Sequence, residues 1–184
     1  MGGPTLTVSI YLGLDSSTQS VTATAVSIDD AQPDRRAILF ERSFRYDEVL
    51  PQYGTQHGVL RSADPRIVHA PPLMWSEALD RILSDLAKET SVDWSQLRAI
   101  SGSAQQHGSV YVNARAAERL KALDPGKPLA DQLQDVFSRK TSPIWMDSST
   151  SGVISGSNHG SIVAPLLPAA VFLSAAENAA QSIL

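Results

Sequence analysis

Apolar and β-branched residues fall into short runs along the first part of the chain, and polar turns separate these runs. The run Thr7–Leu12 predicts a buried strand, and Val21–Ile28 predicts a second strand that follows it closely. Residues Ala37–Phe44 indicate a third strand, and a long connection containing Gly and Pro then leads to Pro71 and Pro72. The pattern therefore predicts three meandering strands before any long helix.

The spacing of apolar residues changes to a helical period between Leu73 and about Lys88. The apolar positions that recur three or four residues apart are Trp75, Leu79, Ile82, Leu83 and Leu86. On the opposite face Glu77, Arg81 and Asp85 follow one another four residues apart with alternating charge. This pattern predicts an amphipathic helix that packs on a sheet.

The later part of the chain alternates between strand and helix signals. Residues Leu97–Ser103 predict a further strand, Leu129–Val136 a short helix and Pro143–Met146 the start of a buried strand. Strands mixed with helices in this order predict an α/β fold.

Composition narrows the classes of partner. With 15 Lys and Arg against 19 Asp and Glu, the net charge is −4, which gives no general attraction for nucleic acid or an acidic membrane surface. The absence of Cys excludes disulfides and thiolate metal sites. The first residues lack the pattern of a secretory signal, and the apolar stretch Ile162–Leu173 is too short and too interrupted by Pro to span a membrane. We therefore expect a cytoplasmic protein with no nucleic-acid or membrane partner.

The turn after the first predicted strand carries the first candidate chemistry. Asp15 ends an apolar run and opens a turn rich in hydroxyl groups, Asp15-Ser16-Ser17-Thr18. Consecutive turn N–H groups and hydroxyls can surround phosphate oxygens, while a carboxylate can hold a hydrated Mg²⁺. An ordinary hairpin turn is the alternative, because Asp and Ser favour turns by bonding their own backbone.

Two later strings add weight to the ligand-binding interpretation. They read Gln105-Gln106-His107-Gly108-Ser109-Val110-Tyr111 and Ile144-Trp145-Met146-Asp147-Ser148-Ser149-Thr150. Together with the Asp15 turn, they resemble the N-terminal part of the FGGY family of carbohydrate kinases, and most closely its xylulokinase branch. Supporting matches occur at Tyr53–Val59 and Pro72–Asp80, so the resemblance covers about residues 5–150.

The resemblance implies a fold and a reaction. The fold would be a partial α/β domain of the ribonuclease H-like, actin-like ATPase type, with a three-stranded meander followed by alternating helices and strands. The family reaction is ATP-dependent phosphorylation of a ketopentose such as D-xylulose, with ATP and Mg²⁺ as cofactors. The family's catalytic Asp, second phosphate loop and adenine-binding segment come later in its order and have no matching string here. We therefore assign no catalytic residue and expect the chain alone to be inactive, while a homodimer stays an open question.

The resemblance also assigns roles to individual residues. The cofactor-binding residues would be Asp15, Ser16, Ser17, Thr18 and Gln19, with Asp15 binding Mg²⁺ through water. Gln106 and His107 would hold the sugar, since their side chains supply the donors and acceptors that sugar hydroxyls need. The alternative for His107 is an exposed residue of a polar turn.

Other polar and aromatic residues receive structural interpretations. Asp147 could face the ligand cleft, but we favour an Asx turn or helix cap. The side chains that we expect to pack in the core are Trp75, Trp145, Met74 and Met146. The histidines that we expect to be ordinary surface or loop residues, because they have no partners at metal-ligand spacing, are His57, His69 and His159.

The composition changes after Thr150. Residues 151–184 contain a single charged side chain, Glu177, and the family resemblance stops here, so we divide the chain into 1–150, the first part of the kinase N-terminal domain, and an atypical tail. A truncated or altered reading frame would explain the tail, and a divergent helix over Ala170–Leu184 is the alternative. We expect residues beyond about 151 to be loosely held.

Two other functions stay open beside the sugar kinase. One is a non-catalytic fragment or sugar-binding module, and the other is an actin-like scaffold that binds nucleotide without phosphorylating sugar. The string Gln105–Gly108 argues against the scaffold, which has no need of a sugar-binding turn.

Overall fold

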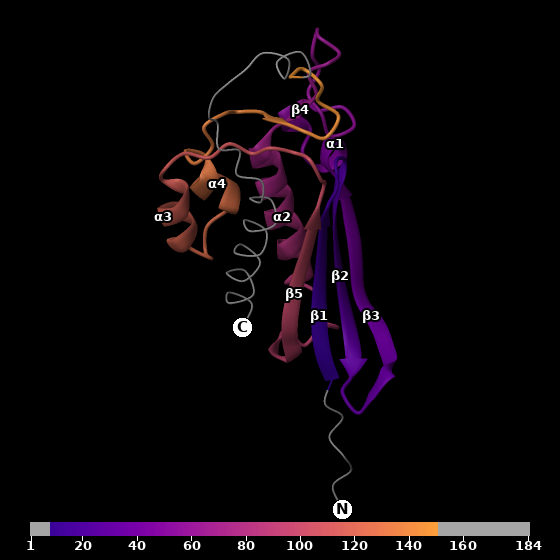
Figure 1. The fold of residues 1–184 in the computed structure, drawn as a ribbon. Coiled ribbons are helices and arrows are strands. Elements are labelled where there is room, and N and C mark those ends of the chain that lie inside the picture. The colour runs from indigo at the N-terminus through magenta and orange to yellow at the C-terminus, as the bar shows by residue number, and fades with distance from the viewer. Residues whose placement is uncertain (1–7, 151–184) are drawn as a thin grey trace, which may run out of the picture.

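A four-stranded mixed sheet organises residues 8–150, the part of the chain that the computed structural model describes (Figure 1). The strand order is β3-β2-β1-β5, with β1 (Val8–Ser16), β2 (Ser20–Asp29) and β3 (Gln32–Arg45) forming an antiparallel meander. Strand β5 (Leu97–Ala104) pairs with β1 in parallel. A parallel neighbour needs a long crossover, and here the crossover contains the helix α2 (Pro72–Leu86).

Helix α2 covers one face of this sheet and forms the core with it. Strand side chains alternate between the two faces, so Ile10, Leu12 and Leu14 of β1 are buried under α2 while Asp15 is exposed on the other face. The buried side chains of α2 include Met74, Ala78, Leu79, Ile82, Leu83 and Leu86. The same alternation turns the Ser16 side chain toward the interior.

Short elements complete the described part of the chain. In chain order they are α1 (Tyr46–Val49), the 3-10 helix η1 (Pro51–Tyr53), β4 (His69–Ala70), the 3-10 helix η2 (Trp94–Gln96), α3 (Ala116–Lys121), α4 (Leu129–Leu133) and β6 (Ser142–Pro143). Helix α4 packs on α2, on the side of the helix layer away from the sheet (Figure 1). Strands β4 and β6 pair with each other as a separate two-stranded ribbon.

The α/β class, the three-strand meander and the amphipathic helix are confirmed. The helix predicted over Leu129–Val136 ends earlier, at Leu133, and α3 was not predicted. The buried strand predicted over Pro143–Met146 is wrong, because only Ser142–Pro143 is extended. A turn closed by the Asp147 amide donating to the Ile144 carbonyl, at 2.9 Å, ends the strand there.

Of the four aromatic and sulfur-containing side chains predicted to pack in the core, two are confirmed and two are wrong. Met74 is fully buried, and Trp75 packs against the core, as expected. Trp145 and Met146 are wrong as core residues, since they are 56% and 40% exposed. Their place in the turn that ends β6, rather than in a strand, accounts for the exposure.

Within residues 8–150, no helix is long and apolar enough to cross a membrane. The predicted loosely held tail, 151–184, lies outside the residues that the structure describes.

Candidate functional site

Three motifs were identified in the sequence: the Asp15 turn (first), the string Gln105–Tyr111 (second) and the string Ile144–Thr150 (third). The ends of β1 and β5 bring the first two together. These strands are parallel, so the turn 17–19 after β1 and the turn 105–108 after β5 lie at the same edge of the sheet. The Gln105 amide donates to the Ser16 carbonyl at 2.9 Å and continues the strand pairing into the turns. Ligands of α/β sheets bind at the carboxyl ends of the strands, and this edge is such a place.

Asp15 lies on the open face of the sheet beside this edge. Its register partner on β5 is Ser103, whose hydroxyl donates a short hydrogen bond to the Asp15 carboxylate. The Asp15 side chain is exposed, whereas the neighbouring Ser16 hydroxyl is buried against the Tyr46 hydroxyl, 2.9 Å away. The carboxylate can therefore meet a ligand, and the Ser16 side chain is held inside the protein.

The turn 17–19 is closed by its own hydrogen bonds. The Ser17 amide donates to the Ser20 carbonyl at 2.9 Å, and the Ser17 hydroxyl accepts from the Ser20 amide at 3.2 Å. The Gln19 side chain accepts from the Arg45 guanidinium at 3.2 Å. All five predicted cofactor-binding residues have hydrogen-bonded side chains, but only Asp15, Ser17 and Thr18 line the site.

The loop 54–59 packs against the backbone of this turn at Thr18. Gly58 has a φ of 78°, and a Cβ added to it would lie 2.0 Å from the Thr18 carbonyl oxygen. Asp47 holds the loop in place by accepting hydrogen bonds from the Thr55 hydroxyl (2.7 Å) and from the amides of His57 (2.5 Å) and Gly58 (3.1 Å). Burial alone would raise the pKa of Asp47, but these bonds outweigh it and hold the pKa below its ordinary value.

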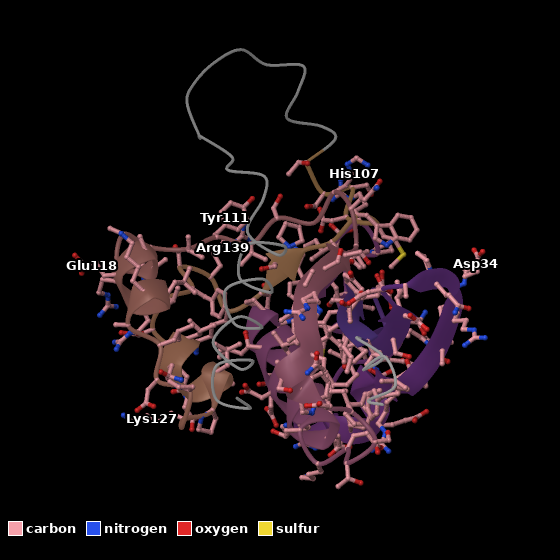
Figure 2. All side chains as sticks on the ribbon, turned by 90° about the horizontal axis from the view of Figure 1, so that it is seen from below. Asp34, His107, Tyr111, Glu118, Lys127 and Arg139 are labelled. Atoms are coloured by element: carbon pink, nitrogen blue, oxygen red, sulfur yellow. The ribbon has the colours of Figure 1, made fainter. Side chains whose placement is uncertain are left out.

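The turn 105–108 carries the two predicted sugar-binding residues at its tip. Gln106 and His107 are both exposed, and His107 has a φ of 58°. Figure 2 shows His107 at the outer rim of the molecule. Among residues 8–150 neither side chain has a hydrogen-bond partner, so their donors and acceptors are available to a ligand.

The third motif reaches the first two through Trp145. The Trp145 indole Nε1–H donates to Thr18 Oγ1 at 3.0 Å, and the Thr18 hydroxyl donates to Gln105 Oε1 at 3.3 Å. These two bonds join the third, first and second motifs in that order. Sequence reasoning missed Trp145, which it placed in the core, and missed the contributions of Gln105 and Ser103.

Asp147 anchors the third motif instead of facing the ligand. Its side chain is only 5% exposed and accepts from the Val68 amide (2.9 Å), the Ser149 amide (3.1 Å) and the Ser149 hydroxyl (2.7 Å). Burial alone would raise its pKa, but the bonds from Ser149 and Val68 and the nearby His69 hold the pKa below its ordinary value. The structure thus favours the turn-forming interpretation of Asp147.

His69 is part of this anchor, which corrects its interpretation as an ordinary surface or loop residue. Its Nε2 lies 3.2 Å from the Asp147 carboxylate, and its Nδ1 lies 2.9 Å from the Thr141 hydroxyl. The ring is 16% exposed. His69, on strand β4, therefore contacts both Asp147 of the third motif and Thr141, which precedes the motif.

The three motifs together line an open hollow of about 430 Å³. Its lining residues are Asp15, Ser17, Thr18, Ala104, Gln105, Gln106, His107 and Trp145. The hydroxyls of Ser17 and Thr18 and the side chains of Gln106 and His107 therefore line the same hollow. Asp15 is the one carboxylate among these lining residues.

The donor set of the hollow fits a hydrated magnesium ion. Within the described part of the chain, no group of three or more His, Asp or Glu side chains could hold a metal ion. Mg²⁺ keeps several waters and binds through one or two carboxylates together with substrate phosphates. An exposed single carboxylate beside a turn rich in hydroxyl groups suits that mode, so Asp15 is the residue that would hold Mg²⁺.

Comparisons with known proteins agree with the motifs. No family model matches the chain. The chain is 47% identical over 139 residues to "Xylulose kinase" of Mus musculus and 45% identical over 144 residues to "Xylulose kinase 2" of Arabidopsis thaliana. These matches cover 76% and 77% of the chain but only 24% of each relative, so the chain spans about a quarter of their length.

Solved structures share the fold. A "xyloylose kinase" from Brucella ovis superposes with a TM-score of 0.50 and 22% sequence identity, covering 77% of this chain and 22% of that one. The ribonuclease H-like, actin-like ATPase fold predicted from the sequence is thereby confirmed as a partial domain.

Proposed function

Because the chain resembles the N-terminal part of xylulose kinases of the FGGY carbohydrate kinase family, we propose that it forms the first part of a ketopentose kinase. The complete protein would transfer the γ-phosphoryl group of MgATP to a hydroxyl of a ketopentose such as D-xylulose. Its expected location is the cytoplasm, and residues 1–150 are the first part of its N-terminal domain.

The observation that carries the proposal is the convergence of three motifs on one hollow. Asp15, Ser17 and Thr18 line it together with Gln106 and His107. In this proposal the first three meet phosphate and its Mg²⁺, and the last two meet the sugar. Phosphoryl transfer depends mainly on holding acceptor and donor in line and on neutralising phosphate charge. A site in which the phosphate and sugar groups line one hollow suits that requirement.

Each residue has a distinct role in this proposal. Asp15 binds hydrated Mg²⁺, which neutralises charge on the phosphates when bound. Ser17 and Thr18 contact phosphate oxygens. Gln106 and His107 pair with sugar hydroxyls, which orients the ketose and excludes compounds that leave those groups unpaired.

We expect the 184-residue chain to bind these ligands weakly and not to turn over. General-base help is worth typically about 10²–10⁴-fold, and no residue here is assigned as that base. A coupled assay of ADP release with D-xylulose should give no rate above that of a matched Asp15→Ala chain. Turnover clearly above that control would mean that an unrecognised base lies within this chain.

Chemical-shift mapping by NMR tests the binding site itself. Mg-ADP should shift the backbone amides of residues 15–19, and D-xylulose should shift those of residues 105–108. If both ligands leave both turns unshifted at millimolar concentration, the proposed site is wrong.

A further inference from the structure

Resting on the proposed function, we propose that Trp145 is a positioning residue for the phosphate side of the site. Its indole N–H fixes the direction of the Thr18 hydroxyl. The hydroxyl then donates its hydrogen bond to Gln105 until a phosphate oxygen replaces Gln105 as the acceptor. The Thr18–Gln105 bond then couples the phosphate side of the hollow to the sugar-binding turn.

The direction of the hydroxyl follows from the chemistry of its two partners. An indole Nε1–H can only donate, so Thr18 Oγ1 must be the acceptor in the 3.0 Å contact with Trp145. A hydroxyl has one proton, and it points to Gln105 Oε1, 3.3 Å away. One lone pair of Thr18 Oγ1 therefore accepts from Trp145, and the Thr18 hydroxyl proton is donated to Gln105.

A phosphate oxygen has no proton to give at neutral pH, so it competes with Gln105 for the Thr18 proton. The 3.3 Å contact is longer than a typical O–H···O bond, so it is the weaker of the two bonds and the easier to exchange. The Trp145 bond stays intact during the exchange, because it uses a lone pair. Phosphate binding thus frees the Gln105 side chain, which directly precedes Gln106 and His107.

The position of Trp145 supports a role in positioning rather than in packing. The side chain is 56% exposed, so it contributes little to the core. Its backbone is held firmly, since the Ile144 amide donates to the Val68 carbonyl at 3.1 Å and Asp147 accepts from the Val68 amide at 2.9 Å. A rigid backbone that presents an exposed indole to Thr18 provides a fixed donor.

The indole signals in an NMR spectrum of the ligand-free 184-residue chain test the geometry. The chain has three tryptophans, and the indole nitrogens of Trp75 and Trp94 are buried without a partner among the described residues. Thr18→Val, which keeps the shape and removes the hydroxyl, should shift the Trp145 Nε1–H signal and speed its exchange with water. The signals of Trp75 and Trp94 should stay in place, and Thr18→Ser should restore the Trp145 signal.

Binding of Mg-ADP tests the consequence. Trp145→Phe removes the donor but keeps an aromatic ring, and it should weaken Mg-ADP binding about three- to tenfold, the worth of one hydrogen bond. Trp94→Phe is the matched control and should leave the affinity unchanged. In the wild-type chain, Mg-ADP should also shift the side-chain amide signals of Gln105.

The outcomes separate this proposal from the proposed function. An unchanged Trp145 indole signal in Thr18→Val overturns the positioning role, whether or not a nucleotide binds. Mg-ADP binding equal in Trp145→Phe and Trp94→Phe overturns it as well. If Mg-ADP shifts no amide of residues 15–19, the proposed function fails, and the indole comparison still decides whether Trp145 orients Thr18.

Discussion

The two neighbouring turns that line the hollow, 17–19 and 105–108, differ in how firmly the protein holds them. The turn 17–19 is closed by bonds between Ser17 and Ser20, contacted by Trp145 at Thr18 and supported from behind by Gly58. The turn 105–108 is tied at its ends by the Gln105 amide to the Ser16 carbonyl and by the Ser109 amide to the Pro143 carbonyl. Its tip, Gln106 and His107, is exposed and unbonded within residues 8–150.

This difference indicates that the two turns contribute differently to stability and to ligand binding. A turn that is already ordered loses little conformational entropy when a ligand binds, which favours tight and specific contacts. A turn with free side chains must be ordered by its ligand or by the rest of a longer protein. We therefore expect substitutions around the first turn to alter stability and substitutions at the second to alter binding alone.

The largest effect is expected at Gly58. Gly58→Ala would place a Cβ 2.0 Å from the Thr18 carbonyl oxygen in a backbone with φ of 78°, so both strain and a clash oppose it. The free energy of unfolding should fall by about 2–5 kcal/mol, measured by urea denaturation.

Gly54→Ala is the matched control for Gly58→Ala. Gly54 also has a positive φ, 66°, but a Cβ there would meet nothing within 4 Å. Its cost should be only the backbone strain, about 1–2 kcal/mol. Equal losses in the two variants would mean that the contact with Thr18 does not support the first turn.

A smaller effect, dependent on pH, is expected at Asp147. An amide in its place cannot accept all the bonds from Val68 and Ser149, so Asp147→Asn should lower the free energy of unfolding at pH 7 by about 1–3 kcal/mol. A carboxyl whose pKa is lowered by folding stabilises above its unfolded pKa and loses that contribution as the pH falls. The difference between wild type and variant should therefore shrink below about pH 4.

Urea denaturation from pH 7 to pH 3 measures this difference, with Asp34→Asn as the control. Asp34 is exposed on β3, at the margin of the molecule in Figure 2. A loss in Asp147→Asn no larger than that in Asp34→Asn at every pH would show that Asp147 does not anchor the third motif.

Local pattern predicted the fold better than it predicted the site. Alternation in β1 and the helical period of α2 directly reflect burial, so both elements could be read from the sequence. The inward direction of Ser16 follows from the same alternation, because Ile10, Leu12 and Leu14 share its face. This signal was present in the sequence, although Ser16 was predicted to bind the cofactor.

The rest of the site depends on contacts between distant segments. Trp145 lies in an apolar run that suggests a core strand, and its exposure results from the pairing of β6 with β4 and from the turn after it. The pairing of Ser103 with Asp15 requires the register of two parallel strands. Neither the partner strand nor its register can be read from a local pattern.

The smallest effect on stability is expected at His107. Because its side chain is exposed and without a partner in the described structure, His107→Ala should change the free energy of unfolding by less than about 0.5 kcal/mol. Urea denaturation measures this as well. A loss comparable to that of Asp147→Asn would show that the second turn is held by His107 and is not open for a ligand.

The most direct test of the account is a crossed titration of the 184-residue chain with two ligands and two variants. Mg-ADP and D-xylulose are titrated separately into wild type, Asp15→Asn and His107→Ala, and affinities are followed by NMR. Asp15→Asn should weaken Mg-ADP binding roughly tenfold to a hundredfold, as expected for loss of a charged partner, and leave D-xylulose binding unchanged. His107→Ala should weaken D-xylulose binding about three- to tenfold and leave Mg-ADP binding unchanged. If either variant weakens both ligands equally, or neither variant weakens any, the hollow is not a two-sided site for a nucleotide and a ketopentose.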